Sequence, residues 1–209
     1  MTKILDPEKT WFTSDTHFEH ARIIELSNRP FGDVKAMGAE ILRNIIKFVP
    51  WDHTLIHLGD VALGPWPEGL RPLKVIHSKK ILLPGNHDRL SSLEKQARRD
   101  RFRPDYEEVF DEIWDEQVEI EMGGVPFVIS HYPPAEISDH GSVDRYPHLR
   151  PVDDGEHHFI HGHTHQSHSL TRLKSGRLAI HVGVDSTGFK PIRGTEIVDV
   201  ARMADLTPV

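Results

Sequence analysis

The sequence contains no cysteine, which excludes disulfide bonds and thiolate metal sites. It has no apolar run near the roughly 18 residues that a membrane-spanning helix needs. Its first stretch, MTKILDPEKTW, lacks the apolar core of a secretory signal. It has no excess of positive charge, because the formal net charge is -7, which disfavours binding to long nucleic acids. These absences predict a cytoplasmic protein that binds neither membranes nor long nucleic acids stably.

The composition is that of a globular protein. Of the 209 residues, 37% are hydrophobic and 27% are charged, a balance that is typical of a folded chain with a sizeable core. Mixed α/β domains of this length are common. We therefore expect residues 1–209 to form a single domain.

The first half of the chain alternates apolar runs with helical patterns. TWFTSD (10–15), TLIHLGD (54–60) and KKILLPGNHD (79–88) predict buried strands that end in polar turns. Between the first two runs, apolar residues recur at helical spacing from Asp33, a plausible N-cap, to Pro50. Strands that alternate with helices in this way are typical of βαβ units and a parallel sheet.

The second half of the chain has a different pattern of apolar and polar residues. EIWDEQVEIEMGGVPFVISH predicts a hairpin that turns at Gly123-Gly124, and LTRLKSGRLAIHVGV a second hairpin that turns at Ser175-Gly176. HHFIHGH adds a strand between them. The pattern indicates two stacked sheets with flanking helices. Residues 132–154 lack periodicity, so they form either a functional loop or a poorly ordered one.

Metal-competent side chains follow five of the apolar runs. A single histidine is more typical of a hydrogen-bonded surface or core position, but here the pattern repeats. Loops at the carboxyl ends of strands converge on one crevice in open α/β sheets. In an extended Asp-x-His or His-x-His segment, the first and third side chains point the same way. The residues concerned are Asp15, His17, Asp60, Asn86, His87, His131, His163 and His165.

The ordered set DTH (15–17), GD (59–60), GNHD (85–88), His131 and GHTH (162–165) resembles the calcineurin-like metallophosphoesterases. The stretches WFTSDTHFEHARIIELSNRPF and HVGVD are similar to small stand-alone members from bacteria and phages. The resemblance implies an α/β (α+β) fold, a four-layer αββα sandwich of two mixed sheets flanked by helices, with a two-metal centre. By position, it implies that Asp15, His17 and His165 bind one metal, that Asn86, His131 and His163 bind the other, and that Asp60 bridges both.

The chemistry of these ligands fits that implication. Imidazole and carboxylate donors without thiolate favour Mn, Fe, Zn, Co or Ni over Mg or Ca, and we expect two divalent ions, with Mn²⁺ first. Such a centre attracts a phosphate and supports in-line attack by a metal-bridging hydroxide. His87 follows the ligand Asn86 directly, so we expect it to be the general acid for the leaving group, with Asp88 orienting it.

Four further residues are predicted to contact substrate. His20 and Arg22 follow the first ligand pair closely, while His140 and Arg145 lie in the loop after His131. Arg145 has a planar fork that suits a phosphate. The basic run ARRDRFRP (97–104) is either a solvated helix face or a phosphate-contacting or partner-contacting surface.

Departures from the family pattern restrict the class of substrate that we expect. Leu63 stands in GDVAL where many members have a second acid, and the surroundings of both GD and GNHD lack the arginines of protein phosphatases. We therefore predict a phosphodiesterase, with some monoesterase activity open, acting on small substrates such as nucleotides or cyclic nucleotides. One alternative is a nuclease on short RNA or DNA ends, which needs residues 98–103 to face the crevice. The other is a non-catalytic scaffold that retains the fold.

Overall fold

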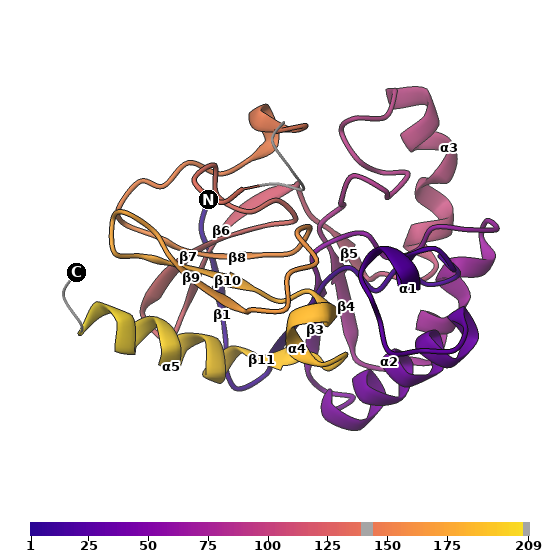
Figure 1. Ribbon diagram of the computed structural model, residues 1–209, viewed down its shortest axis with the longest axis horizontal. Coiled ribbons are helices and arrows are strands. Elements are labelled where there is room, and N and C mark those ends of the chain that lie inside the picture. Colours follow the sequence, from indigo (N-terminus) through magenta and orange to yellow (C-terminus); the bar gives the residue numbers. More distant parts are fainter. Residues whose placement is uncertain (139–143, 207–209) are drawn as a thin grey trace.

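The computed structural model describes residues 1–138 and 144–206, which build two mixed sheets flanked by helices, as predicted (Figure 1). One sheet has six strands in the order β1 (Lys3–Leu5), β6 (Gln117–Met122), β7 (Val125–Ser130), β8 (His158–His161), β10 (Leu178–His181) and β9 (Leu170–Arg172). The other has five, in the order β11 (Ile192–Arg193), β2 (Thr10–Thr13), β3 (Thr54–His57), β4 (Lys79–Leu82) and β5 (Glu112–Ile113).

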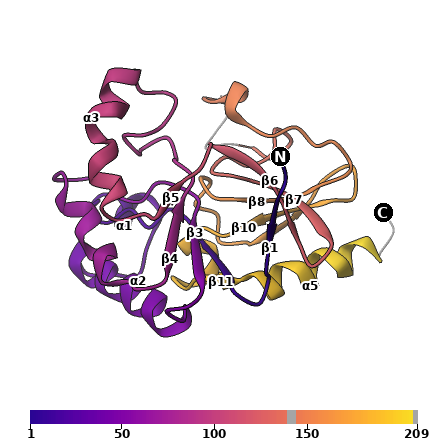
Figure 2. The ribbon, with the colours of Figure 1, turned by 180° about the vertical axis from the view of Figure 1, so that it is seen from behind.

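Helices flank this pair of sheets. Figures 1 and 2 show α1, α2 and α3 beside the five-stranded sheet, whereas α5 runs along the six-stranded one. The helical segments are α1 (Ile23–Leu26), α2 (Val34–Phe48), the 3-10 helix η1 (Glu68–Val75), α3 (Gln96–Glu107), the 3-10 helix η2 (Pro147–Leu149), α4 (Val184–Thr187) and α5 (Gly194–Asp205).

Local sequence signals explain several of these elements. Helix α2 begins where the Asp33 carboxylate accepts hydrogen bonds from the amides of Lys35 and Ala36, at 2.9 and 2.8 Å, as an N-cap should. Both predicted hairpins form, β6–β7 and β9–β10, and each turn uses glycine with positive φ, at Gly123, Gly124 and Gly176.

Alternation along the strands divides the core into layers. Phe12 of β2 and Ile56 of β3 are fully buried between the sheets, against Phe127 of β7. Their neighbours in sequence, Trp11 and Leu55, face the opposite way and pack under α2. The two sheets are therefore held together by apolar side chains of period two, which is why the strand patterns were readable from sequence.

The topology brings the strand ends to one place. Strands β2, β3 and β4 are parallel neighbours, so their carboxyl ends share one edge of the five-stranded sheet. Strands β7, β8 and β10 are parallel neighbours in the other sheet. Ser14, just after β2, pairs with Gly183, just after β10, and so joins the two edges.

Some elements were not predicted. Strands β1, β5 and β11 have only 3, 2 and 2 residues, too few to show a period. Helix α5 did carry a signal, because its buried residues Ile197, Val198, Ala201 and Ala204 lie at helical spacing.

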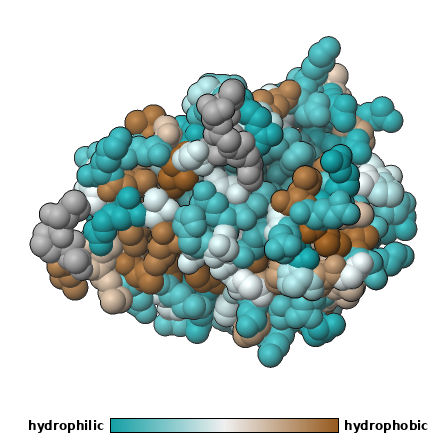
Figure 3. Space-filling view, viewed as in Figure 1, coloured by the Kyte–Doolittle hydropathy of each residue, from teal (hydrophilic) through white to brown (hydrophobic). Residues whose placement is uncertain are grey.

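Hydrophobic residues are scattered over the surface. On the face in Figure 3, brown patches are interrupted by hydrophilic residues, and the middle of this face is mostly teal. Across residues 1–138 and 144–206, none of the helices has the length and apolar character required to span a membrane.

Candidate metal centre

The five strand ends named above meet between the two sheets. The loop after β2 carries Asp15 and His17, the loop after β3 carries Asp60, and the loop after β4 carries Asn86 and His87. His131 directly follows β7, while His163 and His165 follow β8. Backbone hydrogen bonds tie neighbouring loops together, from the Asp15 amide to the Gly59 carbonyl at 3.0 Å and from the Gly162 amide to the His131 carbonyl at 3.0 Å.

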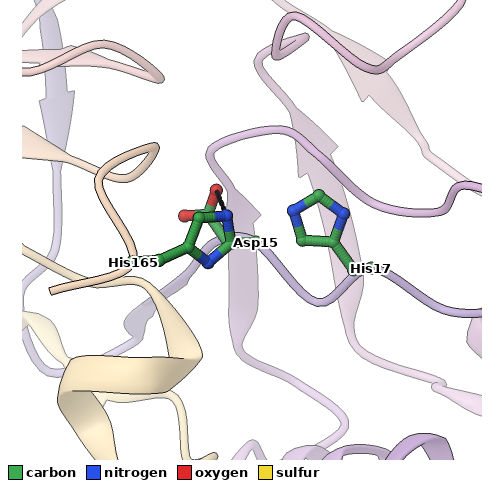
Figure 4. A group of neighbouring side chains, drawn as sticks. All are labelled: Asp15, His17 and His165. Atoms are coloured by element: carbon green, nitrogen blue, oxygen red, sulfur yellow. Dashed lines mark ion pairs between the residues drawn. The ribbon is translucent and has the colours of Figure 1, made fainter. Parts of the chain in front are cut away.

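Asp15, His17 and His165 form one group with metal-ligand spacing. One ligand atom of each lies within 4.8 Å of the other two (Figure 4). The His165 Nε2 is 4.0 Å from an Asp15 carboxylate oxygen, and the His17 and His165 ring centroids are 5.0 Å apart. This is one of the two ligand sets that the family resemblance implied.

A second group consists of Asp15, Asp60 and His131. The two oxygens of Asp60 face different histidines, with Oδ1 3.6 Å from the His131 Nε2 and Oδ2 3.6 Å from the His17 Nε2. The His131 Nε2 is also 3.0 Å from the Asn86 Oδ1 and 3.2 Å from the His163 Nδ1. Asp60 thus lies close to both His17 and His131, and Asp15 is the residue that the two groups share.

The ligand loops have an unusual backbone. Asp15, His17, Asp60, His163 and His165 all have left-handed φ, between 49° and 73°. This conformation is uncommon for residues other than glycine, and such strain clusters at functional sites. It also corrects the sequence argument, which assumed extended Asp-x-His and His-x-His segments. The first and third residues of each pair instead have left-handed φ, so an extended backbone does not explain how they reach the cluster.

Hydrogen-bond partners indicate which ring nitrogen of two of these histidines carries a proton. The His131 Nδ1 donates to the Leu58 carbonyl at 2.7 Å, and the His165 Nδ1 donates to the Asp185 carboxylate at 2.7 Å. Carbonyls and carboxylates only accept, so each Nδ1 carries a proton, and the neutral form of either ring would present the Nε2 lone pair to a metal. Backbone carbonyls and carboxylates are the kind of acceptor that metal-binding histidines use, but the sequence could not name which residues supply them.

The buried polar groups of this cluster fit bound cations. Asp15, His17, Asp60 and His131 are at most 1% exposed, and within the described part of the chain the His17 Nε2 has no hydrogen-bond partner. Burial holds the pKa of His17 well below its usual value, so its imidazole is neutral and can ligate. Burial raises the pKa of Asp60, but His131, His17 and His87 together lower it by more. The net pKa lies below its usual value, so the carboxylate stays charged. Nitrogen and carboxylate donors without sulfur suit borderline divalent metals.

His87 borders the cluster from the loop after β4. Its Nε2 lies 3.9 Å from the Asp60 Oδ2, its ring centroid is 5.6 Å from that of His17, and its side chain is 43% exposed. Its backbone amide donates to the Asp60 Oδ1 at 2.9 Å. An imidazole that is both beside the cluster and open to solvent is suitably placed for a proton donor.

Asp88 differs from the sequence expectation. We expected it to orient the His87 ring, but its carboxylate accepts hydrogen bonds from the amides of Asp60, Val61 and Gly85, at 2.8, 3.2 and 2.8 Å. Burial, followed by the nearby Asp60 charge, raises the pKa of Asp88 to about 7. These contacts join the loops after β3 and β4. The Asp88 side chain is 1% exposed, so its carboxylate accepts from the backbone amides that are buried around it.

The residues predicted to contact substrate are placed unequally. The His20 Nδ1 is 3.3 Å from the His17 Nδ1, so His20 borders the cluster, whereas Arg22 is exposed at the start of α1. Arg145 is exposed and lies over the Tyr146 ring. His140 lies outside the described residues.

The described parts of the 132–154 segment contact the cluster. The Tyr146 ring centroid is 5.8 Å from that of His163 and 5.4 Å from that of Tyr132. Arg150, buried, donates to the carbonyls of Pro133, Pro134 and Ile137 and to the Asp144 carboxylate. This arginine thus fastens the two described arms of the segment, residues 132–138 and 144–154, to each other.

Sequence analysis missed a support behind His165. Arg29, 4% exposed, donates from Nε and Nη2 to the two oxygens of Asp185, both at 2.8 Å, and Nη2 also donates to the Asp15 carbonyl at 2.8 Å. Asp185 in turn accepts from His165. Arg29 and Asp185 lie in the stretches SNRPF and HVGVD that carried the resemblance. The sequence therefore marked both residues, but it did not indicate that they pair.

Comparison with known proteins identifies the family. The model of the calcineurin-like phosphoesterase superfamily domain matches residues 9–188. The gene 66 protein of Mycobacterium phage L5 is 32% identical over 200 residues, covering 91% of this chain and 93% of that protein. An uncharacterised protein of Methanocaldococcus jannaschii is 26% identical over 188 residues, covering 88% and 86%.

A solved structure agrees in sequence and in fold. The crystal structure of a protein of unknown function from Aquifex aeolicus superposes with a TM-score of 0.66 at 31% identity, covering 91% of this chain and 98% of that one. The family match spans both ligand groups and His87. The chain belongs to the calcineurin-like phosphoesterase superfamily and is a metal-dependent phosphoesterase.

Proposed function

We propose that the protein hydrolyses phosphodiester bonds of small substrates, with nucleotides or cyclic nucleotides as the leading class. The observation that supports this most directly is the position of His87 beside a buried cluster of carboxylates and imidazoles. Hydrolysis of a diester with an alkoxide leaving group needs both charge neutralisation at phosphorus and a proton for the departing oxygen. The cluster, with metal bound, would meet the first need, and His87 would meet the second.

The ligands in this proposal come from both groups. Asp15, His17 and His165 would hold one divalent ion, Asn86, His131 and His163 the other, and Asp60, with one oxygen toward each side, would be shared. Mn²⁺ is our first expectation for both. When bound, such ions supply Lewis-acid stabilisation of phosphoryl oxygens and activation of water.

The chain's own residues complete the reaction. We assign to His87 the protonation of the leaving oxygen, from the imidazole N–H that faces the cluster, because Nε2 is 3.9 Å from Asp60. Asp88 holds the loops of Asp60 and His87 together through its three amide contacts. His20, and more distantly Arg22 and Arg145, would contact the substrate's phosphate or sugar; His140 keeps the same assignment from sequence alone.

The direct test is metal-dependent hydrolysis. Protein stripped with a chelator is expected to be inactive on bis(p-nitrophenyl) phosphate and to recover activity on addition of Mn²⁺, with two equivalents bound by elemental analysis. The release of p-nitrophenolate is followed by absorbance. A protein that takes up the metal and yet leaves a panel of diesters and monoesters intact would contradict the proposed function.

The buried pair behind His165 gives a second prediction. Asp185→Asn removes the charge that orients the His165 ring and pairs with Arg29, and we expect about a 10- to 100-fold loss of Mn²⁺ affinity, the usual effect of such supporting contacts. Affinity is measured by calorimetric titration of metal-free protein. Asp199→Asn, an exposed position on α5, is the matched control. Unchanged affinity in Asp185→Asn would show that the pair only stabilises the fold.

A nuclease on short RNA or DNA ends is the second candidate, and one observation favours it. The arginines of the basic run line two different pockets. Arg98 lines one together with Asn86 and His87, while Arg99 and Arg103 line another with Trp114. Only part of the run therefore adjoins the cluster. A preference for a trinucleotide over a dinucleotide of at least tenfold in kcat/KM would favour the nuclease; no preference would favour small substrates.

A further inference from the structure

A pocket adjoins the His87 side of the cluster. It has a volume of about 200 Å³ and lies between the loop after β3, the loop after β4 and the start of α3. Asn86 and His87 form one wall, while Arg89, Arg98 and Trp66 form another. A group attached to the ester oxygen that His87 protonates would enter this pocket.

Arg89 is the distinctive residue of the pocket. Its guanidinium carbon lies 4.6 Å from the centroid of the Trp66 ring and 4.4 Å from that of the Phe102 ring. Trp66 is itself fixed, because its Nε1 donates to the Asp105 carboxylate at 2.7 Å. Cation–π packing restrains the guanidinium without consuming its N–H donors. Arg89 is therefore an ordered cation whose donors stay available.

The charge on Arg89 is not neutralised by a neighbouring acid. Across residues 1–138 and 144–206, no carboxylate forms an ion pair with Arg89, although the side chain is half-buried. Arg98, on the same pocket, differs because its Nε is 3.3 Å from the Glu94 carboxylate. A guanidinium without an acid partner can take an anion as its counter-charge, through paired N–H donors. The pocket thus offers one uncompensated, fork-shaped cation next to the proton donor.

Among the described residues that line the pocket, Trp66 is the aromatic one, and its ring already contacts other side chains. Arg89 lies over the Trp66 ring, and Tyr106 and Phe102 pack around the same ring, with centroids 5.2 and 5.5 Å away. The rings therefore serve to hold Arg89. The chemistry of the pocket is that of an anion site, and a phosphate matches the guanidinium fork in shape and charge.

We propose that this pocket binds a second phosphate, carried on the leaving-alcohol side of the scissile ester, with Arg89 as its main contact. The proposal rests on the proposed function, because it places the pocket relative to His87 as proton donor. It narrows the substrate class to diesters whose leaving group bears its own terminal phosphate, such as short phosphorylated nucleotides.

Equilibrium binding tests the pocket without turnover. Thymidine dinucleotides with a slowly hydrolysed phosphorothioate linkage are titrated into metal-loaded protein, without a terminal phosphate and with one at either end. We expect one phosphorylated form to bind about tenfold more tightly, equivalent to about 1.4 kcal/mol. Arg89→Met is expected to abolish this preference. Equal affinities for all three dinucleotides in the wild type would overturn the proposal.

Controls separate the pocket from general charge and from folding. Arg101→Met removes an equal charge that also lies over the Phe102 ring, but Arg101 does not line the pocket, so the preference should persist. Glu94→Gln frees Arg98 and should increase the preference. If Arg89→Met melts early, Arg89→Lys, which keeps charge but not the fork, serves instead and should weaken the preference. A preference that survives the Arg89 substitutions would also overturn the assignment.

Hydrolysis of the ordinary phosphodiester dinucleotides keeps the two proposals apart. If the wild type cleaves all three at equal rates and binds them equally, the pocket assignment fails and the phosphodiesterase stands. If it binds the phosphorylated form preferentially through Arg89 but cleaves none of them, nor bis(p-nitrophenyl) phosphate, the proposed function fails while the anion site remains.

Discussion

Asp60→Asn is expected to reduce the rate of diester hydrolysis by about a thousandfold or more and to lower the bound metal below two equivalents. The substitution keeps the shape of the side chain but removes the negative charge that lies 3.6 Å from both His17 and His131. Because metal ions contribute several kcal/mol of charge stabilisation at phosphorus, and about 1.4 kcal/mol is tenfold in rate, losing part of the centre costs about three orders of magnitude.

The Asp60 experiment needs metal analysis alongside kinetics. Elemental analysis of reconstituted protein gives the stoichiometry, and bis(p-nitrophenyl) phosphate gives the rate. Asp199→Asn, the exposed α5 position, should change neither. A thermal melt separates loss of metal from loss of fold, because the Asp60 side chain also accepts the His87 amide. An Asp60→Asn protein with two equivalents of metal and wild-type rate would eliminate a shared role for this carboxylate.

His87→Ala is expected to slow hydrolysis in a way that depends on the leaving group. For a dinucleotide, whose leaving alkoxide must be protonated, kcat should fall by about a hundred- to ten-thousandfold, the range of general acid catalysis. For bis(p-nitrophenyl) phosphate the fall should be much smaller, because p-nitrophenolate departs without a proton. Metal content should stay at the wild-type level, since only the His87 backbone amide contacts Asp60 within hydrogen-bonding distance.

A matched histidine tests the specificity of this effect. His77→Ala, at an exposed position just before β4 and so at the opposite end of that strand from Asn86 and His87, should leave the hydrolysis of both substrates unaffected. An equal loss on the two substrates in His87→Ala would show that the residue binds or positions the phosphate rather than protonating the leaving group. Loss of metal in the same variant would instead assign His87 to the centre itself.

Much of the fold was predictable because its signals are local. The period-two pattern of Val125–Ser130 and the glycines at 123 and 124 define a hairpin within one short stretch. The Asp33 cap and the apolar stripe of α2 define that helix in the same way. The short strands β1, β5 and β11 could not be predicted, because pairing with distant neighbours, such as β1 with β6, is what makes them strands.

The candidate site was likewise only partly predictable from the sequence. The motifs that contain Asp15, Asp60 and His163 are recognisable as an ordered set, since each places a polar side chain directly after an apolar run. The contacts of Asp88 were not recognisable, because two of the backbone amides that donate to its carboxylate, those of Asp60 and Val61, lie 28 and 27 residues earlier in the chain. A neighbour in sequence, His87, was the obvious partner, and the fold supplied a different one.

The sequence by itself determined the candidate ligand residues, the strand ends that carry them and the family to which the chain belongs, because those depend on short motifs and on local periodicity. Only the tertiary structure decided the left-handed backbone at these candidate ligands, the Arg29–Asp185 pair, 156 residues apart, and the packing of Arg89 between Trp66 and Phe102. These depend on which distant segments the two sheets bring into contact. Distance along the chain carries no record of such contacts, whereas burial and close packing impose them.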